Sequence, residues 1–451
     1  MFRKFTNGCV VLMQKYLPDP FLFCIILTVV VFALAIPLTG QGALAMVLHW
    51  GNGAWSLLAF SMQMALVLVL GNAMAISPPM QRLLKAWAGI PKTAFSSIVF
   101  VTAISVVACW INWGFGLVVG AILAKEIAKQ GRKVDYRLLI ASAYSGFLIW
   151  HGGFSGSIPL AIANVTAAVT SQTGGVLTES VPTSATIFAP FNLFICVMLL
   201  VLLPLVNAWM HPSEDETVVL DLSLLKEEEV VRTVAVNPAE KIENSPLFSL
   251  VAVIFGLVFL VSHFRAKGFS LDLNIVNLVF LTVGILLHGT PIRYVRAIDQ
   301  AVKGAGGILL QFPFYAGIMG MMVGTNPANG LSLAGVISNG FVAISNNVTF
   351  PVFSFLSAGI VNIFVPSGGG QWAVQGPIMM PAGAALGIPP AVTAMSIAWG
   401  DAWTNMIQPF WALPALGIAG LGARDIMGYC VVDMFVSGII ICVAFLGVGL
   451  L

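Results

Sequence analysis

Polar and glycine residues that could bind an anion gather at four places in a strongly apolar chain. Backbone N–H groups in glycine-rich turns and at the N-termini of short helices can hold a carboxylate without a fixed cation. Two of the places are glycine-bearing tips and two are interrupted helices, and none of them contains Lys or Arg. The candidates are Asn112, Trp113, Gly114, Ser367, Gly368, Gly369, Gly370 and Gln371 in the tips, and His151, Ser155, Ser157, Thr404, Asn405 and Gln408 in the interruptions. Their types predict a binding site for a small anion.

Two ionisable side chains in the interruptions could carry a coupling ion. Asp401 lies in an apolar segment, where a charged side chain costs about 2.5 to 3.5 kcal/mol even on the lenient insertion scale. His151 belongs to the residue type that most readily changes charge near neutral pH. For each, a structural hydrogen bond is the alternative, from Asp401 to nearby amides or Trp403 and from His151 to a freed carbonyl. Asp433 and His288 are expected near the ends of their spans, at the membrane interface.

The composition indicates a polytopic helical membrane protein. Of the 451 residues, 59% are hydrophobic and 8% are charged, and the mean hydropathy is +0.97, far from the usage of soluble domains. The net charge of +2 gives no reason to expect a nucleic-acid partner. The six cysteines show neither metal-ligand spacing nor a disulfide framework, so we expect no metal site and no cofactor.

The spans form two halves around one hydrophilic block. Residues 1–210 are expected to hold an apolar hairpin (94–128) and a broken helix (138–163), and residues 246–451 a hairpin (350–386) and a broken helix (391–419). Residues 211–245 would be a cytoplasmic linker. Basic loops are typically cytoplasmic, which places the N-terminus and both flanks of the first hairpin inside, so that the second hairpin enters the membrane from outside. This predicts about nine crossings and two re-entrant hairpins. Two short spans in place of a hairpin would also return the chain to the side of the membrane from which it entered.

The two halves share one spacing. Tyr144 to Pro159 matches Trp399 to Pro414 without a gap, and Asn112 and Ser367 each lie 32 residues before the start of their match. Together with the loop charges, this predicts two inverted repeats, the hallmark of secondary transporters that bind substrate near the midplane at the repeat interface. No charged ring or carbonyl filter suggests a channel. We expect no enzyme, because the glycines around His151 argue against the continuous helix that would pair it with Ser155.

Aromatic side chains surround the candidate site. The tryptophans Trp110, Trp113, Trp372, Trp399, Trp403 and Trp411 lie in or beside the tips and interruptions. A small monocarboxylate with a short hydrocarbon tail fits this lining, with its carboxylate on backbone amides and its tail on the rings. A dicarboxylate or citrate would require more polar or cationic groups.

The motifs VNIFVPSGGGQWAVQGPIMMPA, GDAWTNMIQPFWALPALGIAG and HGGFSGSIPL resemble those of the bacterial short-chain fatty acid permease family, associated with acetoacetate and butyrate uptake. The family is similar to the ion-transporter superfamily of divalent anion and sodium symporters. The resemblance implies symport across the cytoplasmic (inner) membrane, a scaffold domain, a transport domain with elevator motion, and a homodimer in lipid. The sodium-coupled relatives carry Ser-Asn-Thr at both tips, whereas this chain has Asn112-Trp113-Gly114 and Ser367-Gly368-Gly369. Proton coupling is therefore expected; a sodium-coupled symporter or an exchanger for another small organic anion is the alternative.

Overall fold

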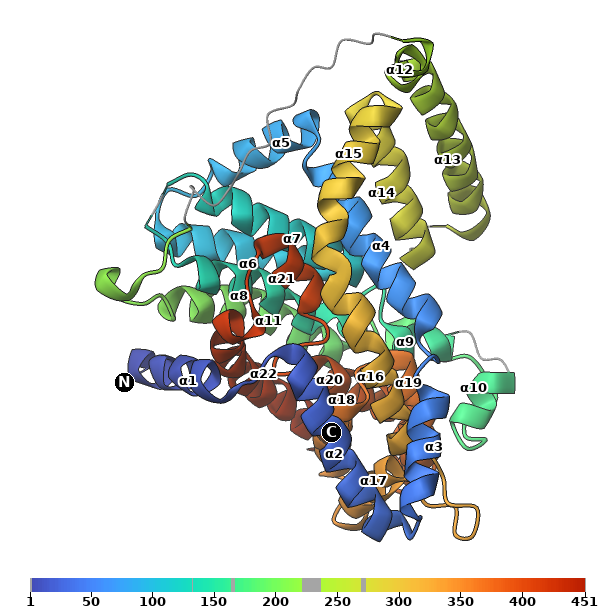
Figure 1. Ribbon diagram of the computed structural model, residues 1–451. Coiled ribbons are helices and arrows are strands. Elements are labelled where there is room, and N and C mark those ends of the chain that lie inside the picture. Colours follow the sequence, from blue (N-terminus) through green and yellow to red (C-terminus); the bar gives the residue numbers. More distant parts are fainter. Residues whose placement is uncertain (1, 132, 164–166, 221–236, 269–272, 451) are drawn as a thin grey trace.

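The computed structural model describes residues 2–131, 133–163, 167–220, 237–268 and 273–450, and within these ranges it contains helices and no strand. Figure 1 shows the chain from its N-terminus in blue to its C-terminus in red. The helices α6, α7, α8 and α11 lie together, and α18, α19 and α20 form a second group. The long helices α4 and α16 pack against each other; α4 also packs against α7 of the first group, and α16 against α18 of the second.

The first half holds most of its helices before residue 164. In chain order they are α1 (Phe2–Tyr16), α2 (Pro20–Thr39), α3 (Ala43–Gly53), α4 (Leu58–Ala75), α5 (Pro78–Ala88), α6 (Ala94–Ile111), α7 (Trp113–Ala128), α8 (Tyr136–Ser145), the 3-10 segment η1 (Gly146–Gly152), α9 (Ser157–Ala163), α10 (Ala167–Gln172), η2 (Thr183–Ala185) and α11 (Pro190–Trp209).

The second half begins with short elements and ends on the longest helix. In order these are η3 (Glu214–Glu216), α12 (Pro238–Glu243), α13 (Pro246–Lys267), α14 (Leu273–His288), α15 (Pro291–Ala301), η5 (Val302–Ala305), α16 (Gly306–Val323), α17 (Leu333–Ala343), α18 (Phe350–Phe364), α19 (Gly368–Ala385), α20 (Pro390–Thr404), α21 (Leu413–Ala419) and α22 (Ala423–Leu450).

Corresponding elements of the two halves start at a nearly constant distance in the sequence. α5 and α17 begin at residues 78 and 333, and α7 and α19 begin at 113 and 368, so both distances are 255 residues. The residues that start α7 and α19 also match in conformation: Asn112 has φ −155° and ψ 123°, and Ser367 has φ −155° and ψ 108°. In both, the side-chain oxygen accepts the N–H three residues further on, as in a standard N-cap. The two tips therefore share one local design.

Both segments expected to be broken helices contain a non-helical interval. Between α8 and α9 the chain passes through η1 and then through residues 153–156, where Gly153 and Gly156 favour irregular backbone. Between α20 and α21 the interval is 405–412. Broken helices at membrane depth leave backbone groups that only protein or a polar cavity can satisfy.

Among the described residues, six helices are long and apolar enough to cross a membrane, namely α2, α6, α11, α13, α16 and α22. A seventh crossing is possible if residues 61–75 and 78–88, bent by 83°, count as one span. The broken helices and α7, α18 and α19 are not among the six. The first arm of the expected hairpin at 94–128, α6, by itself has the length of a span.

One sequence-based expectation outside the candidate site is wrong. Asp433 is fully buried in the interior of α22 instead of lying at a helix end, because α8 and α11 cover that face.

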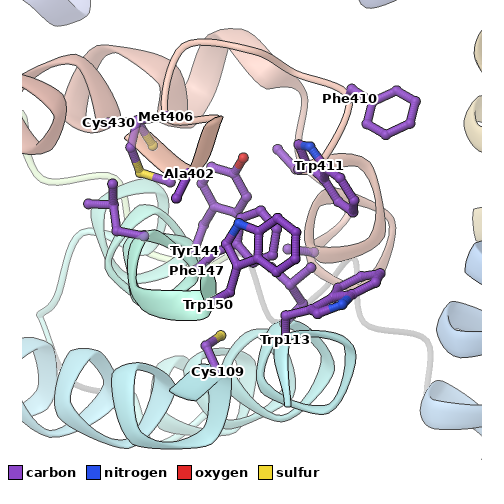
Figure 2. Packing of buried hydrophobic residues seen from close by; sticks show 14 of the residues in the cluster. Cys109, Trp113, Tyr144, Phe147, Trp150, Ala402, Met406, Phe410, Trp411 and Cys430 are labelled. Atoms are coloured by element: carbon purple, nitrogen blue, oxygen red, sulfur yellow. The ribbon is translucent and has the colours of Figure 1, made fainter. Parts of the chain in front are cut away.

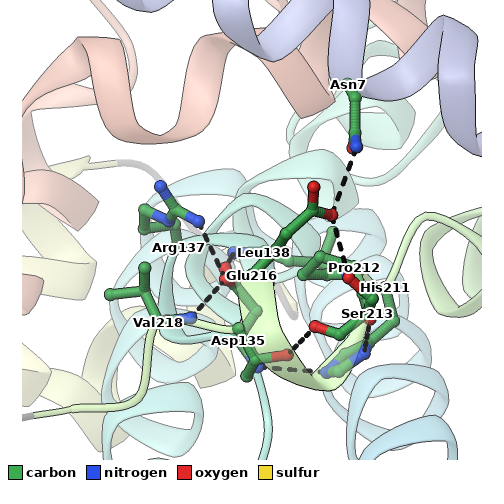
Figure 3. A network of polar contacts seen from close by, with 10 residues as sticks. Asn7, Asp135, Arg137, Leu138, His211, Pro212, Ser213, Glu216 and Val218 are labelled. Atoms are coloured by element: carbon green, nitrogen blue, oxygen red, sulfur yellow. Dashed lines mark hydrogen bonds and ion pairs between the residues drawn. The ribbon is translucent and has the colours of Figure 1, made fainter.

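The start of the expected linker is tied to the N-terminus of α8. The Asp135 carboxylate accepts the N–H groups of Leu138 and Val218, each at 2.9 Å, and pairs with Arg137 at 3.0 Å. His211 Nε2 accepts the N–H of Asp135 at 3.2 Å, and Figure 3 shows this network. Residues 221–236 of the expected linker lie outside the described residues.

Candidate functional site

The two ionisable candidates of the sequence contact each other. His151 lies in η1 and Asp401 in α20, 250 residues apart, and the distance between His151 Nε2 and Asp401 Oδ2 is 3.1 Å. Both side chains are 0% exposed. The other ring nitrogen, His151 Nδ1, and the other carboxylate oxygen, Asp401 Oδ1, are buried and have no hydrogen-bond partner within the described ranges. The pair therefore joins the two interruptions and keeps one free atom at each end.

The second tip lies directly against this pair. A Cβ atom added to Gly368 would lie 2.7 Å from His151 Nε2 and 3.0 Å from the Trp150 ring. Only glycine allows this approach, and it brings the N-terminus of α19 to the imidazole. Ser367 starts α19 by accepting the N–H of Gly370 at 3.3 Å. A Cβ on Gly369 would meet nothing within 4 Å, and one on Gly370 would face Met319 at 3.1 Å. Of the tip glycines, Gly368 is thus the one in contact with the pair.

The first tip is fastened to the first interruption. The Trp113 N–H donates to Ser155 Oγ at 3.0 Å, and Trp110 Nε1 donates to the Gly152 carbonyl at 3.1 Å. The Phe154 N–H returns a bond to the Trp110 carbonyl at 2.8 Å. Ser155 is therefore a structural link. Three other candidates sit nearby: Asn112 caps α7, Gly114 is buried in its first turn, and Ser157 begins α9 half-buried.

An amide that the sequence reasoning missed organises the second interruption. Asn362 of α18 donates through Nδ2 to the Asp401 carbonyl at 2.7 Å, to Thr404 Oγ1 at 3.0 Å and to Asn405 Oδ1 at 2.7 Å. Thr404 in turn donates to the Gly359 carbonyl at 2.7 Å. The sequence contained a signal for it, because Asn362 is the one amide side chain in the segment 350–364 and lies five residues before Ser367. Asn362 and Thr404 are thus engaged in fixing the end of α20.

The two interruptions include three buried N–H donors that have no protein acceptor in the part of the chain that the structure describes. They are Trp150 Nε1, Asn405 Nδ2 and Gln408 Nε2. The oxygen atoms of the two amides are engaged, since Asn405 Oδ1 accepts from Asn362 and Gln408 Oε1 accepts from the Phe410 N–H at 2.6 Å. Buried polar groups without partners are rare in native proteins and call for an explanation. Gln371 differs, because its amide donates to the Ala358 carbonyl and to Gln375, both at 2.8 Å.

Aromatic rings form a wall next to His151. Trp150 stacks nearly parallel on Phe147 at 5.6 Å, and Trp411 lies 5.1 Å from Trp113 with its ring edge-on; Figure 2 shows this cluster together with Tyr144. Two other expected lining residues have their indole N–H groups engaged: Trp399, whose ring lies against Gly152, donates to Asn192 at 2.9 Å, and Trp403 donates to the Met434 carbonyl at 2.7 Å. These two N–H groups are therefore not available to a ligand.

The site offers neutral donors rather than fixed cations. Within the described ranges, the buried polar and charged residues include no Lys and no Arg, and no group of three His, Cys, Asp or Glu could hold a metal ion. Two apolar surface grooves lie away from the pair, one lined by α13 and α14 and the other by α2, α3 and α16. Neutral N–H donors of this kind suit a small anion, and imidazole and carboxylate are groups that can take up or release a proton.

The chain is similar to known transport proteins over nearly its whole length. A sequence model described as "Short chain fatty acid transporter" matches residues 1–448. A relative from Escherichia coli (strain K12) is 46% identical over 430 residues, covering 95% of each chain, and one from Haemophilus influenzae is 44% identical over 438 residues, covering 95% of this chain and 96% of the relative. Both names refer to short-chain fatty acid transport. Among solved structures, the YdaH transporter of Alcanivorax borkumensis aligns with 96% of this chain and 98% of its own at a TM-score of 0.43 and 14% identity.

Proposed function

Because the chain belongs to the short chain fatty acid transporter family, we propose that it carries small monocarboxylates such as acetoacetate and butyrate across the cytoplasmic membrane of a bacterium together with a proton. The observation that carries the proposal is the free Nδ1 atom of His151 in the buried pair with Asp401. When the imidazole is neutral and donates from Nε2, Nδ1 has no proton and its lone pair can only accept a hydrogen bond. When it is protonated, Nδ1 becomes an N–H donor aimed away from Asp401 and available to a carboxylate.

Electrostatics then links the binding of the proton to the binding of the substrate carboxylate. A neutral imidazole beside an ionised Asp401 gives the pair a net charge of −1, and a bound carboxylate would raise the buried charge to −2. Like charges brought together in a low-dielectric site are strongly unfavourable. One proton on the pair removes its net charge and supplies the donor, so the anion binds when the proton is present. This is the coupling expected of a symporter.

The remaining donors account for the preferred substrate class. The carboxylate would accept N–H groups from Trp150, Asn405 and Gln408 and would lie near the N-terminal end of α19 at Gly368, which carries a partial positive charge. The hydrocarbon tail would lie on the rings of Trp113, Trp150 and Trp411, and each buried CH₂ group contributes about 0.8 kcal/mol. A second carboxylate in the same molecule would find no buried Lys or Arg among the described residues, which disfavours dicarboxylates.

The contacts support an alternating-access mechanism of the elevator type. The Trp113–Ser155, Asn362–Asp401 and His151–Asp401 bonds join both tips and both interruptions, so these elements would move as one transport body. The helices outside it would form a scaffold, and we propose a homodimer assembled through that scaffold in the lipid bilayer. The repeated element order and tip caps support two repeats, and the loop charges support their inverted orientation, with a cytoplasmic N-terminus.

Uptake of labelled butyrate into proteoliposomes tests the proposal. An inward proton gradient alone should stimulate uptake, and an inward sodium gradient alone should not. Unlabelled acetoacetate should compete with butyrate, whereas succinate and citrate should not. Stimulation by sodium alone would favour a sodium-coupled symporter, and competition by dicarboxylates would show that the substrate class is wrong.

A further inference from the structure

A second carboxylate, which the proposed pair does not use, is buried in α22. Asp433 is 0% exposed and lies eleven residues into this 28-residue helix. The helix packs against α1, α8, α11, α18 and α20. A buried carboxylate at membrane depth is costly unless it is paired, protonated or bound to a cation.

None of the ion pairs in the described ranges involves Asp433. The charged residues on the helices packed against α22 are engaged or exposed: Arg137 of α8 pairs with Asp135, Asp401 of α20 pairs with His151, and Arg3, Lys4 and Lys15 of α1 are exposed. The buried tyrosines and cysteines on α8, α11 and α22 are Tyr136, Tyr144, Cys196, Tyr429 and Cys430. Within the part of the chain that the structure describes, Asp433 therefore has no counter-charge.

Asn207 of α11 stands between Asp433 and the end of α8. Its amide lies 3.1 Å from both carboxylate oxygens on one side and 2.9 Å from Ser145 Oγ on the other. Ser145 is the last residue of α8, immediately before η1, which carries His151. A hydrogen-bonded row thus runs from Asp433 to the first interruption.

This row has two complete arrangements, and they differ by one proton. With Asp433 protonated, its O–H donates to Asn207 Oδ1, and the amide Nδ2 donates to Ser145 Oγ at 2.9 Å and to Thr102 Oγ1 at 3.3 Å. The Ser145 hydroxyl is then free to donate to the Ser142 carbonyl at 2.9 Å. With Asp433 ionised, the amide must turn over, so that Nδ2 donates to both carboxylate oxygens and Oδ1 accepts from Ser145.

The second arrangement withdraws a bond from the end of α8. A hydroxyl has one proton, so Ser145 cannot donate to Asn207 and to the Ser142 carbonyl at the same time. That carbonyl lies in the last turn of α8, where carbonyls lack helical partners and depend on other donors. The loss of one proton at Asp433 is therefore transmitted, through two side chains, to the backbone at the start of the interruption.

We propose that Asp433 is a second proton-binding site, and that its occupancy sets the hydrogen bond between Ser145 and Ser142 at the end of α8. The geometry favours a proton over a sodium ion, because the Asn207 amide already contacts both carboxylate oxygens. The proposal is independent of which ion drives transport at His151 and Asp401. It can hold even if the transporter is sodium-coupled.

Infrared spectroscopy of the full-length protein in lipid nanodiscs tests this site during a stepwise pH titration without sodium. The parent should show the C=O band of a protonated carboxyl group. Asp433→Asn should lose that band, and Asp401→Asn, the matched carboxylate control, should keep it. The amide introduced by Asp433→Asn can reproduce the hydrogen bonds of a protonated acid, so we expect this variant to fold; a size-exclusion profile like that of the parent checks this.

A second variant keeps the test informative if Asp433→Asn fails to fold. Asn207→Ala should keep the band but shift its frequency, because the carboxyl group loses its acceptor. Ser145→Ala should leave the band in place. A spectrum of Asp433→Asn that equals the parent spectrum at every pH, no shift in Asn207→Ala, or a band that added sodium abolishes would each overturn the proposal, the last in favour of a cation site.

Discussion

The first and second interruptions occupy matching places in the two halves but contribute different chemistry. Counted with the 255-residue distance, Asp401 corresponds to Gly146 and His151 corresponds to Met406. The first interruption supplies an imidazole and the second a carboxylate, and they meet as one pair. The two halves thus share the order of their elements, but each half contributes a different functional side chain to the pair.

Packing explains why the carboxylate has no counterpart. A Cβ on Gly146 would lie 2.6 Å from Ser105 of α6, so the start of η1 approaches α6 too closely for any side chain there. The two interruptions are also fixed differently. The first is bonded to its tip through Trp113 and Ser155, whereas the second is held by the Asn362 amide. The repeated spacing therefore specifies the order of the helices and tips, whereas the packing at each position determines whether a functional side chain fits there.

The largest effect is expected where the second tip meets the first interruption. Gly368→Ala places a Cβ 2.7 Å from His151 Nε2, which must displace the imidazole or the tip. We expect butyrate uptake to fall to background at unchanged expression. Gly51→Ala on α3 is the control, because its Cβ would meet nothing within 4 Å. Parent-level uptake by Gly368→Ala would show that the tip does not need this close approach.

The next largest effect is expected on stability, where removing the Asn362 amide from the second interruption is compared with removing the Ser155 hydroxyl from the first. Asn362→Ala leaves acceptors on Thr404, Asn405 and Asp401 without their donor, and we expect a loss of about 1 to 3 kcal/mol in stability. Ser155→Ala removes a single bond to the Trp113 N–H and should cost about 1 kcal/mol. Thermal unfolding in detergent measures both variants. An equal or larger loss in Ser155→Ala would contradict the view that the amide organises the second interruption.

The smallest effect concerns one donor at the aromatic wall. Trp150→Phe keeps a ring against Phe147 but removes the Nε1–H group. Losing one hydrogen bond to a charged ligand costs about 1.5 kcal/mol, so we expect KM for butyrate to rise about tenfold while the thermal stability stays near that of the parent. An unchanged KM with normal stability would remove Trp150 from the carboxylate site.

The sequence was sufficient to find the residues that are unusual in an apolar chain. His151, Asp401 and the glycine tips stand out because charged groups and consecutive glycines rarely occur within membrane spans. Local patterns could not show that His151 meets Asp401, because that contact joins segments 250 residues apart. They also could not show that Asp433 is buried, since its environment comes from α8 and α11 rather than from α22 itself.

The central claim is that the pair formed by His151 and Asp401 couples the proton to the substrate. Asp401→Asn tests it most directly when two assays are run on the same proteoliposomes, proton-driven uptake of labelled butyrate and exchange of internal for external butyrate. In Asp401→Asn, a neutral imidazole leaves the pair without net charge, so butyrate can bind whether or not a proton is present. We therefore predict that exchange persists and proton-driven accumulation is lost. Proton-driven accumulation at the parent level in Asp401→Asn would contradict the account.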